Sequence, residues 1–180
     1  MNFNVSINDF DEIITIVPLC IGDGNKVAFY SGSGLGTASV IRENSDISPP
    51  IYLETETLIN ILNKQNIIKI DSMKIDIEGS EYRILEELIE IQNSLCGLVI
   101  EFHDVDLHVE KIKNFIDKLQ LTLTHIHPNN YGPVDKNNDP TVIEFTFEKQ
   151  PIEISENCSL PNFLDQANNP LEKDIDLKFE

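Results

Sequence analysis

The stretch from residue 73 to residue 81 constrains the fold more than any other part of the chain. It reads MKIDIEGSE, in which Met73, Ile75 and Ile77 alternate with charged residues. Apolar side chains spaced two residues apart lie on one face of a β-strand. After Gly79 the apolar spacing becomes helical, with side chains at Ile84, Leu85, Leu88 and Ile91. The pattern therefore predicts a strand that turns at Gly79 directly into a helix.

The rest of the chain alternates between strand and helix patterns, which is typical of α/β domains. The run from Ile13 to Ile21 is almost continuously apolar, as expected for a strand that is covered on both faces. Further strands are expected at 26–30, 51–54, 96–103, 121–126 and 141–148, and helices at 57–65, 80–92 and 105–119. This order predicts an α/β fold with a mostly parallel, doubly wound sheet and helices on both faces.

Length and charge limit the classes of function. The chain has 180 residues, and we assign residues 1–150 to one α/β domain and residues 151–180 to a polar acidic tail. Its 31 acidic and 13 basic residues give a net charge of −18, which repels a nucleic acid backbone. No apolar run approaches the roughly 20 residues that a membrane span needs. We therefore expect a cytoplasmic protein whose partners are neither nucleic acids nor membranes.

Charged side chains gather at the ends of two neighbouring predicted strands. Asp76 and Glu78 end the first strand, and Glu101 and His103 end the next. Ligands of open α/β sheets bind at the carboxyl edge of the strands, so we expect these four side chains to converge there. A simpler explanation is that the two carboxylates stabilise the helix N-terminus by about 0.3–1 kcal/mol each, with Lys74 paired to Asp76.

Three further segments could contact a ligand. Asp23 follows the apolar run 13–21 and is either a turn residue or a ligand contact. Asn129 and Asn130 follow another strand and are either loop residues or substrate contacts. The glycine-rich segment 32–36 lacks the context of a phosphate-binding loop, so we interpret it as a surface loop or a lid.

His125 and His127 lie two residues apart on a predicted strand and therefore share a face. This spacing permits a pair of metal ligands. No carboxylate follows at the spacing of a known metal motif, so the sequence does not predict a metal site here.

The segment Lys74–Glu81 resembles the FkbM-type methyltransferases, which have a class I, Rossmann-like methyltransferase fold and use S-adenosylmethionine (SAM). The resemblance extends over about residues 2–149 and includes the segments 17–23, 99–103, 127–130 and 142–147. It implies a seven-stranded sheet and the transfer of a methyl group to a hydroxyl of a small molecule or sugar.

The resemblance also implies roles for individual residues. Asp23 and Glu78 would contact SAM, while Asp76, Glu101 and His103 would be catalytic, with His103 or Asp76 accepting the proton of the hydroxyl. Substrate contacts would come from Asn129 and Asn130. A divalent metal held by the carboxylates is an alternative use of the same groups.

The family's glycine-rich SAM loop and its ribose-binding acid lie upstream of where Met1 falls in the family pattern. We therefore expect a fold that lacks its first strands and self-associates through an open sheet edge. Two alternatives follow from the same residues: a degenerate, non-catalytic protein that needs a partner, and a metal-dependent hydrolase that uses the carboxylates without SAM.

Overall fold

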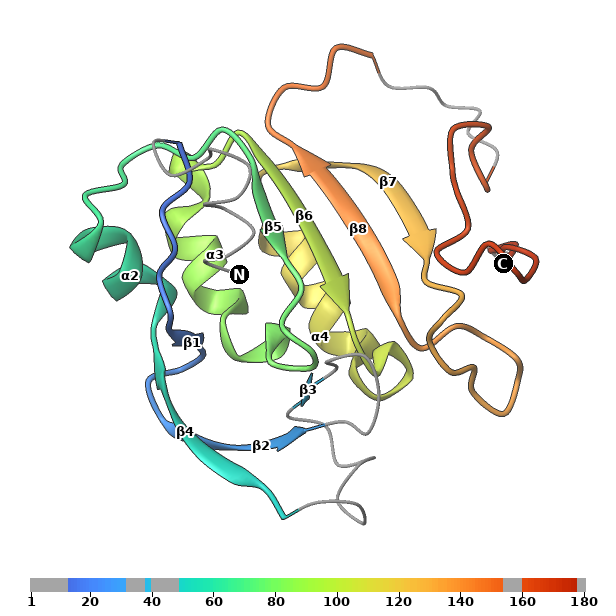
Figure 1. The fold of residues 1–180 in the computed structure, drawn as a ribbon. Coiled ribbons are helices and arrows are strands. Elements are labelled where there is room, and N and C mark those ends of the chain that lie inside the picture. Colours follow the sequence, from blue (N-terminus) through green and yellow to red (C-terminus); the bar gives the residue numbers. More distant parts are fainter. Residues whose placement is uncertain (1–12, 32–37, 40–48, 154–159, 178–180) are drawn as a thin grey trace.

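The computed structural model describes residues 13–31, 38–39, 49–153 and 160–177, which form two four-stranded sheets and several helices (Figure 1). We call the sheet with the order β1-β4-β2-β3 the N-terminal sheet and the sheet with the order β5-β6-β8-β7 the C-terminal sheet. The glycine-rich segment 32–36 lies outside the described residues. The described part of the chain contains no helix that is both long and apolar enough to cross a membrane.

The C-terminal sheet positions most of the predicted site residues. Its strands are β5 (Met73–Ile75), β6 (Gly97–Phe102), β7 (Thr122–Pro128) and β8 (Ile143–Glu148). β5 pairs with β6 in parallel, whereas β8 runs antiparallel to both β6 and β7. β5, β6 and β7 therefore point the same way, and β8 lies between two of them in the opposite direction.

The N-terminal sheet consists of β1 (Cys20–Ile21), β2 (Lys26–Ser31), β3 (Ala38–Ser39) and β4 (Ile51–Glu56). β1 and β4 are parallel, and the other two pairs are antiparallel. The expected long buried strand at 13–21 is reduced to two residues, and Ile13 is 77% exposed. Two causes are visible: Pro18 has no N–H for a strand ladder, and β1 pairs only with β4 among the described strands.

The helices form where the sequence predicts them. α2 (Leu58–Lys64) begins after Thr57, whose side chain accepts a hydrogen bond from the Asn60 N–H at 3.3 Å. The helix expected at 80–92 is divided into a 3-10 helix η2 (Glu81–Arg83), α3 (Leu85–Ile91) and a short 3-10 helix η3 (Gln92–Ser94). α4 (Val105–Lys118) connects β6 to β7.

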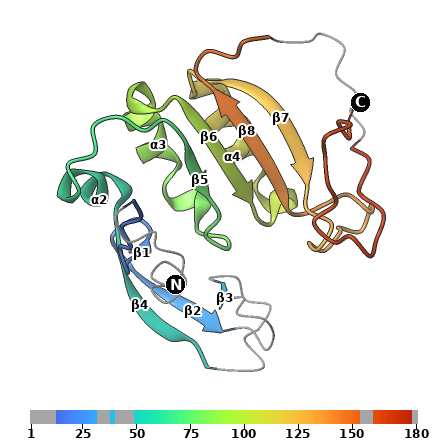
Figure 2. The same cartoon turned by 45° about the horizontal axis from the view of Figure 1, so that its top comes forward.

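One face of the C-terminal sheet contains the core. α3 and α4 lie side by side on this face, and Phe115 of α4 packs edge-on against Phe102 of β6 and Phe147 of β8 (Figures 1 and 2). The expected arrangement with helices on both faces is therefore not confirmed, since these two helices share one face. The mostly parallel pairing is also not confirmed, because β8 separates β6 from β7.

Polar side chains form a row across the opposite face of the C-terminal sheet. The strand register places Glu101 opposite Glu144, and Glu144 opposite His127. Residues directly opposite one another on adjacent strands lie on the same face. We call this line of side chains, from Asp76 through Glu101 and Glu144 to His127, the polar row.

Candidate functional site

The site begins where β5 and β6 end side by side. The register pairs Ile75 with Ile100, so Asp76 and Glu101 are the next residues of the two segments. Both strands have buried apolar residues on the helix-covered face, which leaves Asp76 and Glu101 on the polar row. The prediction that polar groups after these two strands meet at the carboxyl edge matches this geometry.

The backbone makes a sharp turn after each of these strands. Glu78 has a φ of +55° and Asp104 has a φ of +52°, both in the left-handed region that side chains other than glycine seldom adopt. Gly79, with a φ of +93°, completes the first turn. Such strained positions concentrate at functional sites. Here the two turns point Glu78 and His103 toward each other.

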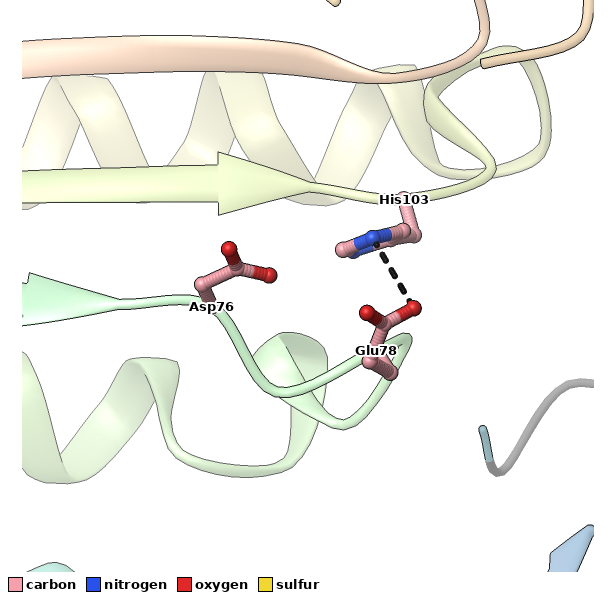
Figure 3. Close-up of side chains that lie close together, drawn as sticks. All are labelled: Asp76, Glu78 and His103. Carbon is pink, nitrogen blue, oxygen red and sulfur yellow. Dashed lines mark ion pairs between the residues drawn. The ribbon is translucent and has the colours of Figure 1, made fainter. Parts of the chain in front are cut away.

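Asp76, Glu78 and His103 form the centre of the site (Figure 3). The Nε2 atom of His103 lies 3.5 Å from Oε2 of Glu78 and 3.9 Å from Oε1 of Glu101. One possible ligand atom from each of Asp76, Glu78 and His103 lies within 4.8 Å of the others, so a small cation could be held here. The same arrangement suits a proton shared between an imidazole and carboxylates, and it does not require a metal.

Glu101 is held on two sides. Its Oε1 accepts a hydrogen bond of 2.9 Å from the Asn129 amide, and its Oε2 lies 3.7 Å from Nζ of Lys74. Lys74 also pairs with Glu144 on β8. Lys74 therefore contacts carboxylates of both β6 and β8, and it does not pair with Asp76 alone.

Glu81 is a site residue that the sequence analysis missed. Its side chain is completely buried, and its Oε1 accepts hydrogen bonds from the backbone N–H groups of Ile77 (3.1 Å) and Gly79 (3.2 Å). The same oxygen lies 3.2 Å from Nδ1 of His103. The sequence does contain a signal for this position. Glu81 lies three residues before the buried Ile84, and residues three apart lie on the same face of a helix, so Glu81 falls on the buried side.

The pKa values of His103 and Glu78 are both raised, but for different reasons. Burial alone would lower the pKa of His103, but the hydrogen bond to Glu81 and the negative charges of Glu81, Glu78 and Glu101 outweigh burial and raise this pKa. Burial raises the pKa of Glu78, and the nearby His103 opposes this rise only in part. Both groups therefore retain a proton more readily than they do in water.

Asp23 lies at the edge of the same region. Its carboxylate accepts a hydrogen bond of 3.1 Å from the Asn25 N–H, as a turn aspartate does, and pairs with Arg83 of η2 at 3.2 Å. The backbone bond from Asn25 is the main cause that lowers the pKa of Asp23. Through Arg83, the turn between β1 and β2 is joined to the segment that also carries Glu81.

The two predicted asparagines have different partners. Asn129 binds Glu101 and so belongs to the site. Asn130 instead binds the C-terminal segment 160–177: its Oδ1 accepts a hydrogen bond of 2.6 Å from the Asn169 N–H, and its amide donates to the Asn169 carbonyl at 3.1 Å. This segment contains neither helix nor strand and lies beside β7 (Figure 1).

A comparison with protein families identifies the chain. A family model described as the methyltransferase FkbM domain matches residues 1–132, which include the site residues from Asp23 to Asn130. The chain belongs to the FkbM methyltransferase family. Membership of this FkbM family supports a methyltransferase, for which SAM is the usual methyl donor. No curated protein and no solved structure matches the chain significantly.

The carboxylates at this edge of the FkbM domain match the cationic groups and the hydroxyls of SAM in their chemistry. SAM has a positively charged sulfonium and an ammonium group, together with ribose hydroxyls that donate hydrogen bonds. Carboxylates are acceptors and carry negative charge. Asp23 and Glu78 provide such groups close to the carboxyl ends of β1 and β5.

Proposed function

We propose that the chain is a SAM-dependent O-methyltransferase that acts on a hydroxyl group of a small molecule or sugar. One observation supports this proposal more than the others: Asp76, Glu101 and His103 converge at the carboxyl edge of β5 and β6 within an FkbM domain. A hydroxyl becomes a better nucleophile when a neighbouring base removes its proton, and an imidazole beside carboxylates is suited to that step.

Two residues are assigned to the methyl donor. Asp23 and Glu78 would hold SAM, which supplies an activated methyl group when it is bound. Glu78 is half-buried and its backbone is fixed by the left-handed turn, so its carboxylate has a defined position. Asp23 is held by Asn25 and Arg83. These constraints reduce the entropy that would be lost on binding.

The acceptor side uses the residues of β6 and the loop after β7. Nε2 of His103, or the carboxylate of Asp76, accepts the proton from the acceptor hydroxyl. Glu101 is fixed by Asn129 and orients the hydroxyl by accepting its hydrogen bond. A positioned base typically contributes about 10²–10⁴-fold to the rate, and alignment of the reacting groups contributes further. Substrate contact by Asn130 stays a prediction.

The test is SAM binding by calorimetry, followed by transfer of labelled methyl groups to a panel of hydroxyl compounds and sugars. We expect SAM to bind and a hydroxyl to be methylated. In Asp76→Asn the transfer should fall, whereas Asp106→Asn, an exposed carboxylate in the first turn of α4, should leave it unchanged. Absence of both binding and transfer would contradict the proposal, and unchanged turnover in Asp76→Asn would remove Asp76 from the mechanism.

A metal-dependent reaction is the second candidate, favoured by the ligand atoms of Asp76, Glu78 and His103 within 4.8 Å of one another. Such a protein would use a divalent ion either to orient the acceptor or, without SAM, to hydrolyse a substrate. Calorimetry with Mn²⁺ separates the cases. Tight Mn²⁺ binding without SAM binding would favour the hydrolase.

Self-association is a separate proposal that follows from the sheet edge. Among the described strands of the C-terminal sheet, β5 pairs only with β6, and no described strand pairs with its other side. We propose that a second copy or a partner protein covers this edge. Sedimentation over a range of protein concentrations would detect a dimer, and a monomer throughout would exclude pairing with a second copy.

A further inference from the structure

Glu81 is the most deeply buried carboxylate near the proposed reaction, and the roles assigned above do not use it. Its side chain is 0% exposed, although it is charged when ionised. Burying a carboxylate is costly unless it receives hydrogen bonds. Oε1 accepts two of them from the backbone of the turn at 77–79, while Oε2 is buried without a partner among the described residues. The position of Glu81 therefore calls for an explanation beyond packing.

In the hydrogen bond between Glu81 and His103, the histidine is the donor and the carboxylate is the acceptor. Oε1 already serves as an acceptor for the N–H groups of Ile77 and Gly79, so it contacts Nδ1 of His103 as an acceptor as well. Nδ1 must then carry the hydrogen. In a neutral imidazole with its hydrogen on Nδ1, the lone pair lies on Nε2.

The other ring nitrogen, Nε2, lies on the side where the methyl acceptor is proposed to bind. Nε2 of His103 points toward Glu78 and Glu101, at 3.5 and 3.9 Å, while the side chain of His103 is only 10% exposed. The next residue of η2 also binds His103, because the Tyr82 hydroxyl donates a hydrogen bond of 2.7 Å to the His103 carbonyl. Two successive residues of one 3-10 helix thus fix the ring and the backbone of His103.

We propose that Glu81 is a positioning residue that keeps the hydrogen of His103 on Nδ1 and thereby leaves Nε2 to accept the proton of the acceptor hydroxyl. In this step the O–H bond would break, the proton would join Nε2, and the electron pair would stay on the oxygen. That oxygen would form the bond to the methyl carbon as the bond from this carbon to the sulfur of SAM breaks, and the electron pair of the broken bond would stay on the sulfur of the departing S-adenosylhomocysteine. The proton transfer rests on the proposed function, but the tautomer that Glu81 imposes on His103 does not.

The first test needs no substrate. Long-range ¹H–¹⁵N NMR spectra of the ¹⁵N-labelled chain distinguish the two neutral forms of each histidine, and His103→Gln identifies the signals of His103. We expect the hydrogen on Nδ1. A neutral His103 with its hydrogen on Nε2 would overturn the proposal.

Variants then separate positioning from structure. Glu81→Leu removes the acceptor, so the hydrogen should no longer be confined to Nδ1, and methyl transfer should fall about 10²-fold or more. Glu81→Gln keeps an oxygen but removes the charge, which lowers the proton affinity of His103. The acidic limb of the kcat/KM profile should therefore move to lower pH, with a smaller loss of rate than in Glu81→Leu.

Glu87 provides the matched control. It is a partly buried carboxylate of α3 that accepts a hydrogen bond of 2.8 Å from the Ile59 N–H, but it does not contact His103. Glu87→Gln should leave the tautomer and the pH profile unchanged. If Glu81→Leu does not fold, the wild-type spectrum and the Glu81→Gln variant still test the proposal. A kcat/KM pH profile of Glu81→Gln identical to that of the wild type would overturn it. If the spectrum places the hydrogen of His103 on Nδ1 but no methyl transfer is detected, the proposed function is contradicted and the role of Glu81 is not.

Discussion

Histidines lie beside carboxylates at both ends of the polar row, but the two groups of contacts have different roles. At the β5–β6 end, His103 contacts Glu81 through Nδ1 and turns Nε2 toward Glu78 and Glu101. At the β7 end, Nε2 of His125 lies 2.9 Å from Asp165, and Nε2 of His127 lies 3.1 Å from Asp174. One arrangement leaves a ring nitrogen facing the proposed site, and the other fastens the C-terminal segment to a strand.

This difference shows that a histidine–carboxylate pair is not by itself a site. The spacing of His125 and His127 permits a pair of metal ligands without predicting a metal site, and the two side chains do lie on one face, with their ring centroids 6.4 Å apart. Their carboxylate partners, Asp165 and Asp174, belong to the C-terminal segment 160–177, and these contacts connect that segment to β7. At His103 the partner Glu81 is wholly buried, and several carboxylates surround the other nitrogen.

Removal of the two kinds of histidine should give the largest contrast. His103→Gln should lower methyl transfer by about 10²–10⁴-fold, because the proton acceptor is lost. His127→Gln should loosen the C-terminal segment and leave turnover unchanged. Rates measured with saturating SAM and an acceptor found by screening would test this. Equal losses in both variants would show that the two ends of the polar row are not distinct in function.

The pH dependence of stability should sharpen the same comparison with a smaller effect. The folded chain raises the pKa of His103 above its ordinary value of 6.5, so the native state retains a proton that the unfolded chain has already released. This contribution is complete below about pH 6.5 and is lost as the pH rises through the higher, folded pKa. Glu78, whose pKa is also raised, gives a loss of the same sign that begins at lower pH, near its ordinary value of 4.5.

Urea denaturation at a series of pH values would measure this trend. We expect the free energy of unfolding to fall as the pH rises above about 6.5 in the wild type, and to fall less in His103→Gln. An identical slope in both proteins would show that His103 does not carry the raised pKa.

Two adjacent asparagines offer the smallest and most local test. Asn130→Ala removes the acceptor of the Asn169 N–H, so exchange of this amide with solvent should become faster by an amount equivalent to about 1 kcal/mol. Asn129→Ala frees Glu101 instead and should leave exchange at Asn169 unchanged. Hydrogen-exchange NMR compares the two variants directly. Faster exchange at Asn169 in both would mean that the site and the C-terminal segment are coupled.

Much of the local structure could be predicted because it depends on neighbours in the chain. The alternation of Ile75 with Lys74 and Asp76 predicted β5, and the spacing of Ile112 and Phe115 placed them on the buried face of α4. The apolar run at 13–21 was misleading, because a continuous apolar stretch forms a buried strand only if other elements cover both of its faces. The direction of β8 was also not predictable, since strand periodicity is the same in parallel and antiparallel sheets.

The amino-acid sequence alone determined the corner at Gly79, the family and the convergence of Asp76 and Glu101 with His103 at one sheet edge. Side-chain period and strand order suffice for these, because both are local or follow from general rules of α/β topology. Only the tertiary structure decided which nitrogen of His103 meets Glu81, that Asn129 and Asn130 serve different parts of the chain, and that Lys74 reaches Glu144 across the sheet. These contacts join residues that are 22 to 70 positions apart in the sequence. Strand register and the turns with positive φ at Glu78 and Asp104 bring these residues together, and local sequence patterns do not determine either feature.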